Sequence, residues 1–191
     1  MAQPVIEGGV GVGSYSTDEG ARLTSERPKP SIKVREPLLS EILDRVHRAK
    51  NKDDKIKILK EEHCLALEQI CQWAFNPTIT SALPSGAPPY IENEAPEGTE
   101  HTLLRTEGNG LWHFVKVNDK PADPNIQKTV MERMFIRLLE GLHKDEAKLL
   151  CMVKDKKLVY NQKEKTGIKG LSVPILQEAF NWDDDFKKKD V

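Results

Sequence analysis

The stretch Pro37-Leu-Leu-Ser-Glu-Ile-Leu-Asp-Arg-Val46 decides the fold class of this 191-residue chain. Its apolar residues return at three- and four-residue spacing, which places them on one face of a helix. Pro37 suits the first turn of such a helix, where its missing N–H costs nothing. The pattern therefore predicts an amphipathic helix at the start of the folded part of the chain.

The rest of the chain continues this pattern. A second, longer helix is expected from Asp53 to Asn76-Pro77, and further helices over 126–140, 145–154 and 173–180. Asn109-Gly110 is the strongest hairpin signal, because alternating segments flank it on both sides. The prediction is a mainly α fold, a small helical domain of about five helices with one β-hairpin near 102–117.

The two ends differ in composition from this middle. Residues 1–36 are rich in glycine and proline and are typical of a disordered N-terminal arm. Residues 182–191 are mostly charged and predict a short C-terminal tail. We therefore expect a single helical domain over residues 37–181.

The charge balance argues against a general affinity for polyanions. Lys and Arg number 29 against 30 Asp and Glu, so the net charge is −1 and attracts neither nucleic acid nor anionic lipid over the whole molecule. No segment approaches the roughly 20 apolar residues that cross a bilayer. We expect a soluble protein of the cytoplasm that makes no membrane contact.

The three cysteines do not suggest a disulfide or a zinc site. Cys64 and Cys71 fall seven residues apart in the second predicted helix, about 10 Å along its axis, which is too far for a disulfide. His63 beside them lacks a fourth ligand at a finger-like spacing. His143 and Glu146 fit the start of a helix better than a metal site. The sequence predicts free thiols, no catalytic residues, no metal and no other cofactor.

The segment Leu83-Pro-Ser-Gly-Ala-Pro-Pro-Tyr90 is the main candidate binding site. Its prolines forbid a helix and favour an extended conformation, and such segments are recurrent recognition elements because little entropy is lost when they bind. Two interpretations of Tyr90 stay open: an interface anchor, or a side chain that pins a connector against the core. The predicted protein-binding residues are Pro84, Gly86, Pro88, Pro89 and Tyr90.

Two lysine clusters form an alternative site for nucleic acid. Their ammonium groups could neutralise phosphates, although acidic residues lie between them, as on an ordinary solvated helix face. One cluster opens the second predicted helix and the other follows the helix over 145–154. The clusters are Lys52, Lys55, Lys57 and Lys60, then Lys154, Lys156 and Lys157.

Several segments occur in an order and spacing that resemble a known group of proteins. They include Leu83-Pro-Ser-Gly-Ala-Pro-Pro-Tyr90, Asn93-Glu-Ala-Pro-Glu-Gly-Thr-Glu-His-Thr102 and Met134-Phe-Ile-Arg-Leu-Leu-Glu-Gly-Leu-His143. Over roughly residues 38 to 185 the chain is similar to an uncharacterised family of small proteins from T-even-like tailed phages of marine bacteria, especially cyanophages. The glycine-rich arm departs from the short N-termini of that family. The resemblance implies a phage origin and brings no catalytic residues with it.

The expected function is non-enzymatic. We expect a phage accessory protein that binds a phage or host protein, either as a virion component or as an adaptor in the host cytoplasm. The alternative is a nucleic-acid-associated factor of phage replication or transcription that uses the lysine clusters.

Overall fold

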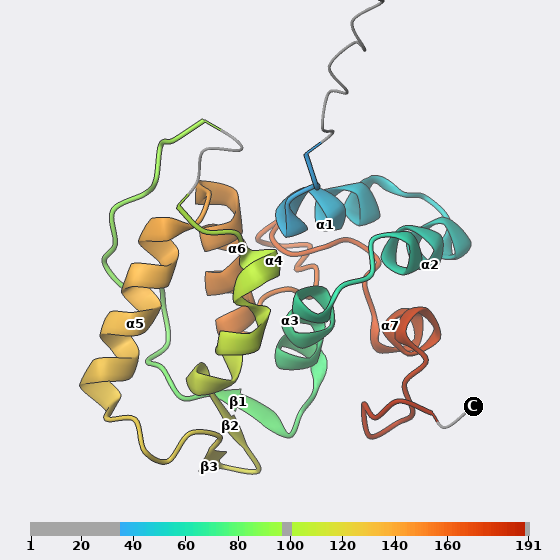
Figure 1. Cartoon of the computed structure of the whole chain (residues 1–191). Coiled ribbons are helices and arrows are strands. Elements are labelled where there is room, and N and C mark those ends of the chain that lie inside the picture. The colour runs from blue at the N-terminus through green and yellow to red at the C-terminus, as the bar shows by residue number, and fades with distance from the viewer. Residues whose placement is uncertain (1–34, 97–100, 190–191) are drawn as a thin grey trace, which may run out of the picture. The chain divides into compact units, whose positions relative to one another are not determined.

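Seven α-helices and one 3-10 helix dominate the described part of the computed structural model, residues 35–96 and 101–189 (Figure 1). A small antiparallel sheet of order β1-β2-β3 completes it, and the predicted mainly α fold is confirmed. The elements are α1 (Leu39–Arg48), α2 (Lys52–Glu61), α3 (Leu65–Phe75), β1 (Ile79–Ser81), α4 (Leu104–Glu107), η1 (Gly108–Phe114), β2 (Val115–Val117), β3 (Lys120–Pro121), α5 (Lys128–Gly141), α6 (Lys144–Lys154) and α7 (Val173–Phe180).

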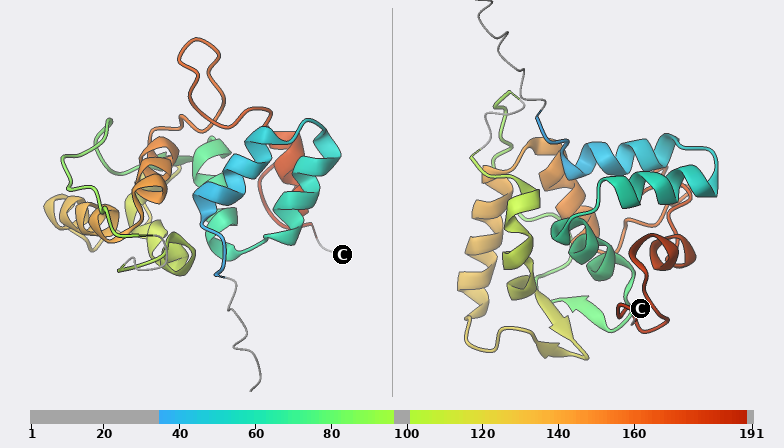
Figure 2. Two further views of the ribbon diagram at one scale, coloured as in Figure 1. Left: turned by 90° about the horizontal axis from the view of Figure 1, so that it is seen from above. Right: turned by 45° about the vertical axis from the view of Figure 1, so that its right-hand side comes forward.

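Helix α3 lies at the centre of the packing. It contacts α4, η1, α6, α7 and β1. In Figures 1 and 2 it stands between the α5–α6 pair and the α2–α7 pair. A helix that is apolar on nearly all sides must be surrounded. Its buried apolar residues are Ala66, Leu67, Ile70, Cys71, Trp73 and Ala74.

The prediction of one long helix from Asp53 to Asn76 is wrong, because the structure has two helices there, α2 and α3. The chain leaves α2 after Glu61 and is fully extended at Cys64, with φ −151° and ψ 160°. Ile56 and Leu59 of α2 are buried where it packs on α1 and α7, whereas α3 packs mainly on η1 and α6. The two helices therefore need different directions. Cys64 precedes α3 instead of lying inside a helix, and all three cysteines are free, as predicted.

The hairpin is present, but not at Asn109-Gly110. Its turn is Asn118-Asp119, where both residues have positive φ, 50° and 64°, and Val117 pairs with Lys120 across it. Two consecutive left-handed residues are the geometry that lets a two-residue turn match the twist of its strands. The third strand, β1, pairs with β2 and was not predicted.

Residues 108–114 form a 3-10 helix because their buried positions recur every third residue. Gly108, Leu111 and Phe114 are buried, while Trp112 points outward. A three-residue period is that of a 3-10 helix and not of a strand. A side chain at Gly108 would place its Cβ 2.9 Å from Ala66 Cα, so glycine lets η1 approach the backbone of α3.

The predicted charged tail is also corrected. Trp182 and Phe186 are buried, and their rings form a chain of contacts with Phe180. Gln72 of α3 donates a hydrogen bond to the Phe186 carbonyl at 3.1 Å. Residues 182–189 therefore fold back on α3 and α7, because two large aromatic rings among the charges gain more by burial than by exposure.

The predicted arm, residues 1–36, lies outside the described residues up to position 34. The first described residue, Arg35, forms an ion pair with Glu41 at 2.7 Å. Within the described ranges, no helix has both the length and the apolar character needed to cross a membrane.

A buried carboxylate joins three helices. Glu146 of α6 accepts one hydrogen bond from the backbone N–H of Leu39 and one from that of Leu104, both at 2.9 Å. These are the first residues of α1 and α4, whose N–H groups have no partner inside their own helices. The positive ends of both helix dipoles stabilise the negative carboxylate between them.

Candidate functional site

The proline-rich segment, residues 83–90 and here called the strap, is fixed to the end of α6. Lys154 donates a hydrogen bond from Nζ to the Pro84 carbonyl at 2.7 Å, and it also contacts the carboxylate of Asp155. The backbone N–H of Gly86 donates to that carboxylate at 3.0 Å. Gly86 has φ +86°, a conformation that other residues rarely adopt. The strap is therefore held in one extended shape by the Lys154–Asp155 pair.

Beyond Tyr90 the chain continues along α5, as Figure 1 shows. The N–H of Ile91 donates to Glu140 at 3.4 Å, and the Asn93 amide donates to the Gly141 carbonyl at 3.5 Å. These contacts tie the segment to the C-terminal turn of α5. The strap is therefore anchored at two places, to the end of α6 through its own residues Pro84 and Gly86, and to α5 just after Tyr90.

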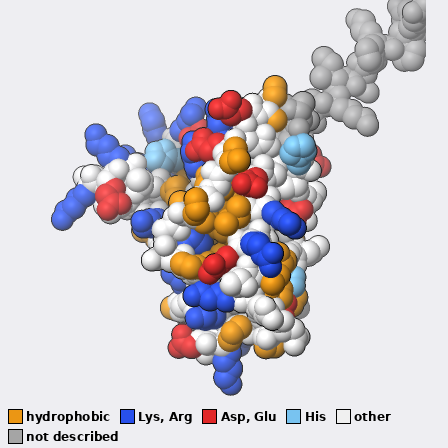
Figure 3. Space-filling model, turned by 90° about the vertical axis from the view of Figure 1, so that its left-hand side faces the viewer, with side chains coloured by type: hydrophobic (Ala, Val, Ile, Leu, Met, Phe, Trp, Pro, Cys, Tyr) orange, Lys and Arg blue, Asp and Glu red, His pale blue; other side chains and the backbone are white. Residues whose placement is uncertain are grey.

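A hollow of about 340 Å³ opens between the strap and α5, and we call it the strap hollow. Every strap residue from Leu83 to Pro89 lines it, opposite Glu132, Phe135 and Ile136 of α5, with Lys154. Its lining is mostly apolar. Figure 3 shows the face that carries α5 and the strap, where hydrophobic side chains gather near the middle among charged ones.

The structure separates the five strap residues of the predicted site into two groups. Pro84, Gly86, Pro88 and Pro89 line the strap hollow. Tyr90 instead packs, partly buried, against the hydrophobic core. Burial raises the pKa of the Tyr90 phenol, and nearby Cys151 raises it further. This placement favours the interpretation of Tyr90 as a pin for the strap.

The lysines of the first cluster have mixed environments. Lys55 is buried, and its Nζ donates to the carbonyls of Val46 and Lys169. Burial lowers the pKa of the Lys55 ammonium, and Lys169 lowers it further. Lys52 is paired with Glu178 at 2.6 Å. The exposed members of this cluster are Lys52, Lys57 and Lys60.

Two lysines of the second cluster donate hydrogen bonds to backbone carbonyls, one in the strap and one at the end of α3. Lys154 is buried beneath the strap, and Lys156 donates to the Asn76 carbonyl at 2.6 Å. Burial lowers the pKa of the Lys156 ammonium. Lys157 is exposed to solvent. Three of the seven predicted lysines, Lys55, Lys154 and Lys156, thus donate to backbone carbonyls of the fold.

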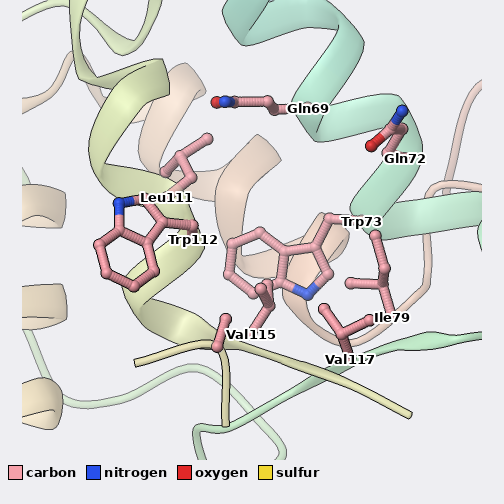
Figure 4. A pocket seen from close by; sticks show the side chains of 9 residues that line it. Gln69, Gln72, Trp73, Ile79, Leu111, Trp112, Val115 and Val117 are labelled. Atoms are coloured by element: carbon pink, nitrogen blue, oxygen red, sulfur yellow. The ribbon is translucent and has the colours of Figure 1, made fainter. Parts of the chain in front are cut away.

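A second hollow, here called the Trp112 groove, was missed by sequence reasoning. It measures about 210 Å³ and lies between α3, η1 and one face of the sheet. Figure 4 shows Trp73 of α3 in the middle, with Trp112 on one side and Ile79 and Val117 on the other. The signal that could have found it is the three-residue spacing of Gly108, Leu111 and Phe114, which leaves Trp112 facing outward.

Outside these hollows the structure pairs histidines with carboxylates, among them His63 with Glu68 at 2.9 Å and His113 with Asp123. His113 Nδ1 lies 2.7 Å from Asp123 Oδ2, and Asp123 is buried. The other carboxylate oxygen of Asp123 accepts from the N–H of Asn125 at 3.0 Å, so the pair also shapes the turn before α5. Among the described residues, no group of three or more His, Cys, Asp and Glu side chains is placed to hold a metal ion.

Comparison with family models identifies the family. Residues 42–160 match the model described as Family of unknown function (DUF6433). The chain belongs to the DUF6433 family. No curated protein and no solved structure is similar to it at a significant level.

The span that DUF6433 covers contains both hollows. It runs from α1 to just past α6 and includes the strap, the hairpin and η1. Helix α7 and residues 182–189 fall after it. The surfaces described above therefore belong to the matched part of the chain.

Proposed function

We propose that this DUF6433 protein is a phage accessory protein that acts by binding another protein through the strap hollow. The observation that carries the proposal is the pairing of an apolar hollow with a strap held rigid by Lys154 and Asp155. The phage origin rests on the resemblance, over roughly residues 38 to 185, to proteins of T-even-like tailed phages of marine bacteria. The expected place of action is the host cytoplasm or the virion.

The strap hollow suits a side chain of a partner protein. Its lining combines prolines of the strap with Phe135 and Ile136, so an apolar side chain would lose water-exposed area there. Lys154 is already paired with Asp155, which leaves Glu132 as the unpaired charge at the rim among the described contacts. Apolar burial would then supply most of the affinity.

The rigidity of the strap favours binding by a preformed surface. A segment that must order itself on binding loses conformational entropy at that step. The strap is already ordered by its bonds from Pro84 and Gly86 to α6. A partner therefore meets a surface that changes little on association.

The proposal is tested by affinity purification from phage-infected cells, together with mass spectrometry of purified virions. Wild-type protein is compared with Ile136→Asp, which places a charge in the strap hollow, and with Val159→Asp as a matched control. Val159 is 53% exposed and lies outside the hollow, so its charge is solvated. One protein should be recovered with wild type and Val159→Asp but not with Ile136→Asp.

Salt dependence separates this proposal from nucleic-acid binding. Contacts with phosphates weaken steeply as salt is added, whereas an apolar interface does not. Equal recovery of the partner at low and high salt supports the strap hollow. Recovery of DNA or RNA that is lost on adding salt, and on the change Lys57→Glu, would refute it.

A further inference from the structure

We propose that the chain binds the phosphate backbone of a DNA duplex through a projecting loop between α6 and α7. The loop comprises residues 156–169 and is here called the lysine hairpin. This inference goes beyond the proposed protein-binding function and does not depend on it, because the lysine hairpin contributes no residue to the strap hollow.

The lysine hairpin is a narrow two-stranded arm. Figure 2 shows it extending beyond the helices, at the top of the left-hand view. The backbone N–H of Asn161 donates to the Thr166 carbonyl at 2.8 Å, and that of Ile168 donates to the Leu158 carbonyl at 2.8 Å. The Asn161 side chain accepts a further bond from the N–H of Lys163 at 3.0 Å. These bonds order the arm, while every side chain from Asn161 to Thr166 is exposed.

The charge of the lysine hairpin is concentrated and is not neutralised by the fold. The arm carries five lysines and one acidic residue, Glu164, whereas the whole chain has a net charge of −1. Across the described ranges, neither Glu164 nor any of these lysines takes part in an ion pair. By contrast, Lys52 of α2 lies 2.6 Å from Glu178. The five lysines are Lys156, Lys157, Lys163, Lys165 and Lys169.

A hollow at the base of the lysine hairpin has the chemistry of a phosphate site. It measures about 540 Å³, lies between the strap and the end of α6, and is here called the hairpin hollow. Three hydroxyl side chains line it, those of Thr80, Ser81 and Ser85. Hydroxyl and lysine side chains are common donors to the phosphates of nucleic acids. The hairpin hollow therefore adds neutral donors to the cationic arm.

Two lysines of the hairpin hollow keep N–H groups for a ligand. A third, Lys154, is paired with Asp155, so its charge is compensated. Lys156 donates one of its three N–H groups to the Asn76 carbonyl, and Lys157 is exposed. Lys157 belongs to the hairpin hollow and to the lysine hairpin, so the two form one continuous cationic surface.

The shape of the lysine hairpin favours a DNA duplex over other polyanions. The major groove of B-form DNA is about 12 Å wide and admits a two-stranded ribbon, whereas that of duplex RNA is too narrow. Proteins that bind single strands stack the bases on exposed aromatic rings. The one aromatic residue of the arm, Tyr160, is partly buried, and its ring lies 5.9 Å from that of His47. A single strand therefore finds no stacking platform on the arm.

Fluorescence anisotropy with a short labelled DNA duplex tests the proposal on the full chain. Contact of three lysines with phosphates predicts an affinity that falls about fortyfold between 50 mM and 200 mM salt. A duplex RNA, a single-stranded DNA and polyglutamate, all of matched charge, are titrated in parallel. Each of these three should bind at least tenfold more weakly than the DNA duplex.

Charge reversal at the tip of the arm is the deciding change. Lys163→Glu with Lys165→Glu should weaken DNA binding at least tenfold at 50 mM salt and reduce its dependence on salt. Both side chains are exposed, so the fold should be retained, and an unchanged thermal melt by circular dichroism verifies this. Lys57→Glu with Lys60→Glu makes the same charge change at exposed positions of α2 and should bind DNA like wild type.

Three outcomes overturn the proposal. They are no binding of the DNA duplex at 50 mM salt, equal losses in the tip variant and its α2 control, and polyglutamate that binds as tightly as the duplex. The last outcome would assign the lysine hairpin to an acidic protein instead. Ile136→Asp should leave DNA binding unchanged, because Ile136 lines the strap hollow and not the hairpin hollow. Failure here is therefore distinguishable from failure of the strap hollow.

Discussion

Lys154 donates a hydrogen bond from its buried ammonium group to the carbonyl of Pro84, across 70 residues of sequence and 2.7 Å of space. The bond fixes the first proline of the strap to the last residue of α6. Its partner Asp155 holds Gly86 by accepting a hydrogen bond from the Gly86 backbone N–H at 3.0 Å. The shape of the strap hollow thus depends on one charged pair at a helix end.

Replacing Lys154 by methionine should loosen the strap. The change leaves the Pro84 carbonyl without its donor and Asp155 without its counter-charge, so the free energy of unfolding should fall by about 2 kcal/mol. Urea unfolding measures this loss, and limited proteolysis should cut the variant within residues 83–90. Lys157→Met is the matched control, because Lys157 is exposed and should change stability by less than about 0.5 kcal/mol. Equal stability of both variants would show that the bond does not hold the strap.

The carboxylate of Glu146 should be needed for the junction of α1 and α4. Glu146→Gln keeps the volume but replaces one accepting oxygen by an NH₂ group, which cannot accept from Leu39 or Leu104. The free energy of unfolding should fall by about 2 kcal/mol. Glu61→Gln on the exposed face of α2 serves as the control. Chemical denaturation with both variants measures the difference, and an unchanged midpoint for Glu146→Gln would contradict the assigned role.

A methyl group at Gly108 should push η1 away from α3. Its Cβ would lie 2.9 Å from Ala66 Cα, a contact that the backbone of a central helix cannot easily relieve. Gly108→Ala should therefore lower stability by about 1–3 kcal/mol. Gly110→Ala is a close control in the same element, since its Cβ would meet nothing nearer than Glu107 Oε2 at 4.0 Å. Thermal unfolding should separate the two variants, and identical melting temperatures would argue against this close packing.

Stability should decrease at alkaline pH because of the buried thiols. Burial raises the pKa of Cys71 above its ordinary value of 9.0, and burial raises that of Cys151 in the same direction. Above pH 9.0 the unfolded chain releases these protons while the folded chain keeps them, so the unfolded state gains stability as pH rises. Below pH 9.0 these thiols are protonated in both states, and their full contribution to the free energy of unfolding is present. Melting temperatures measured from neutral pH upward should fall less steeply for Cys71→Ala than for wild type, and parallel curves would refute this cause.

Much of the helical fold follows from local pattern. Leu39, Ile42, Leu43 and Val46 are all fully buried, because their spacing leaves a single face for the core. Residues 173–180 form a helix over the predicted range for the same reason. Where one apolar periodicity runs without interruption, the sequence alone is sufficient to predict the helix and its buried face.

The errors occur where distant segments decide the local structure. The apolar stripe continues past Cys64, but α2 and α3 bend apart there because α7 and η1 lie on different sides of them. Asn109-Gly110 would suit a turn, yet burial at Gly108 and Leu111 makes this segment helical. Trp182 and Phe186 lie in a charged run, and only their neighbours on α3 and α7 explain why they are buried.

The candidate site was predicted in part. Prolines indicate that the strap is extended, since Pro84, Pro88 and Pro89 follow one another too closely for a helix to continue through them. They do not indicate what the strap faces. Phe135 and Ile136 form the opposite wall, and their positions depend on how α5 packs against α6. The Trp112 groove depends still more on tertiary contacts, because α3, η1 and the sheet each supply one wall.

Photo-crosslinking in phage-infected cells tests most directly whether a protein partner occupies the strap hollow. A benzophenone amino acid is placed at Ile136, inside the hollow, or at Val159, outside it. We predict a crosslink to one protein from position 136 that is absent from position 159 and unaffected by added salt. The same crosslinked proteins from both positions, or crosslinks to nucleic acid from position 136, would contradict binding of a protein at the strap hollow.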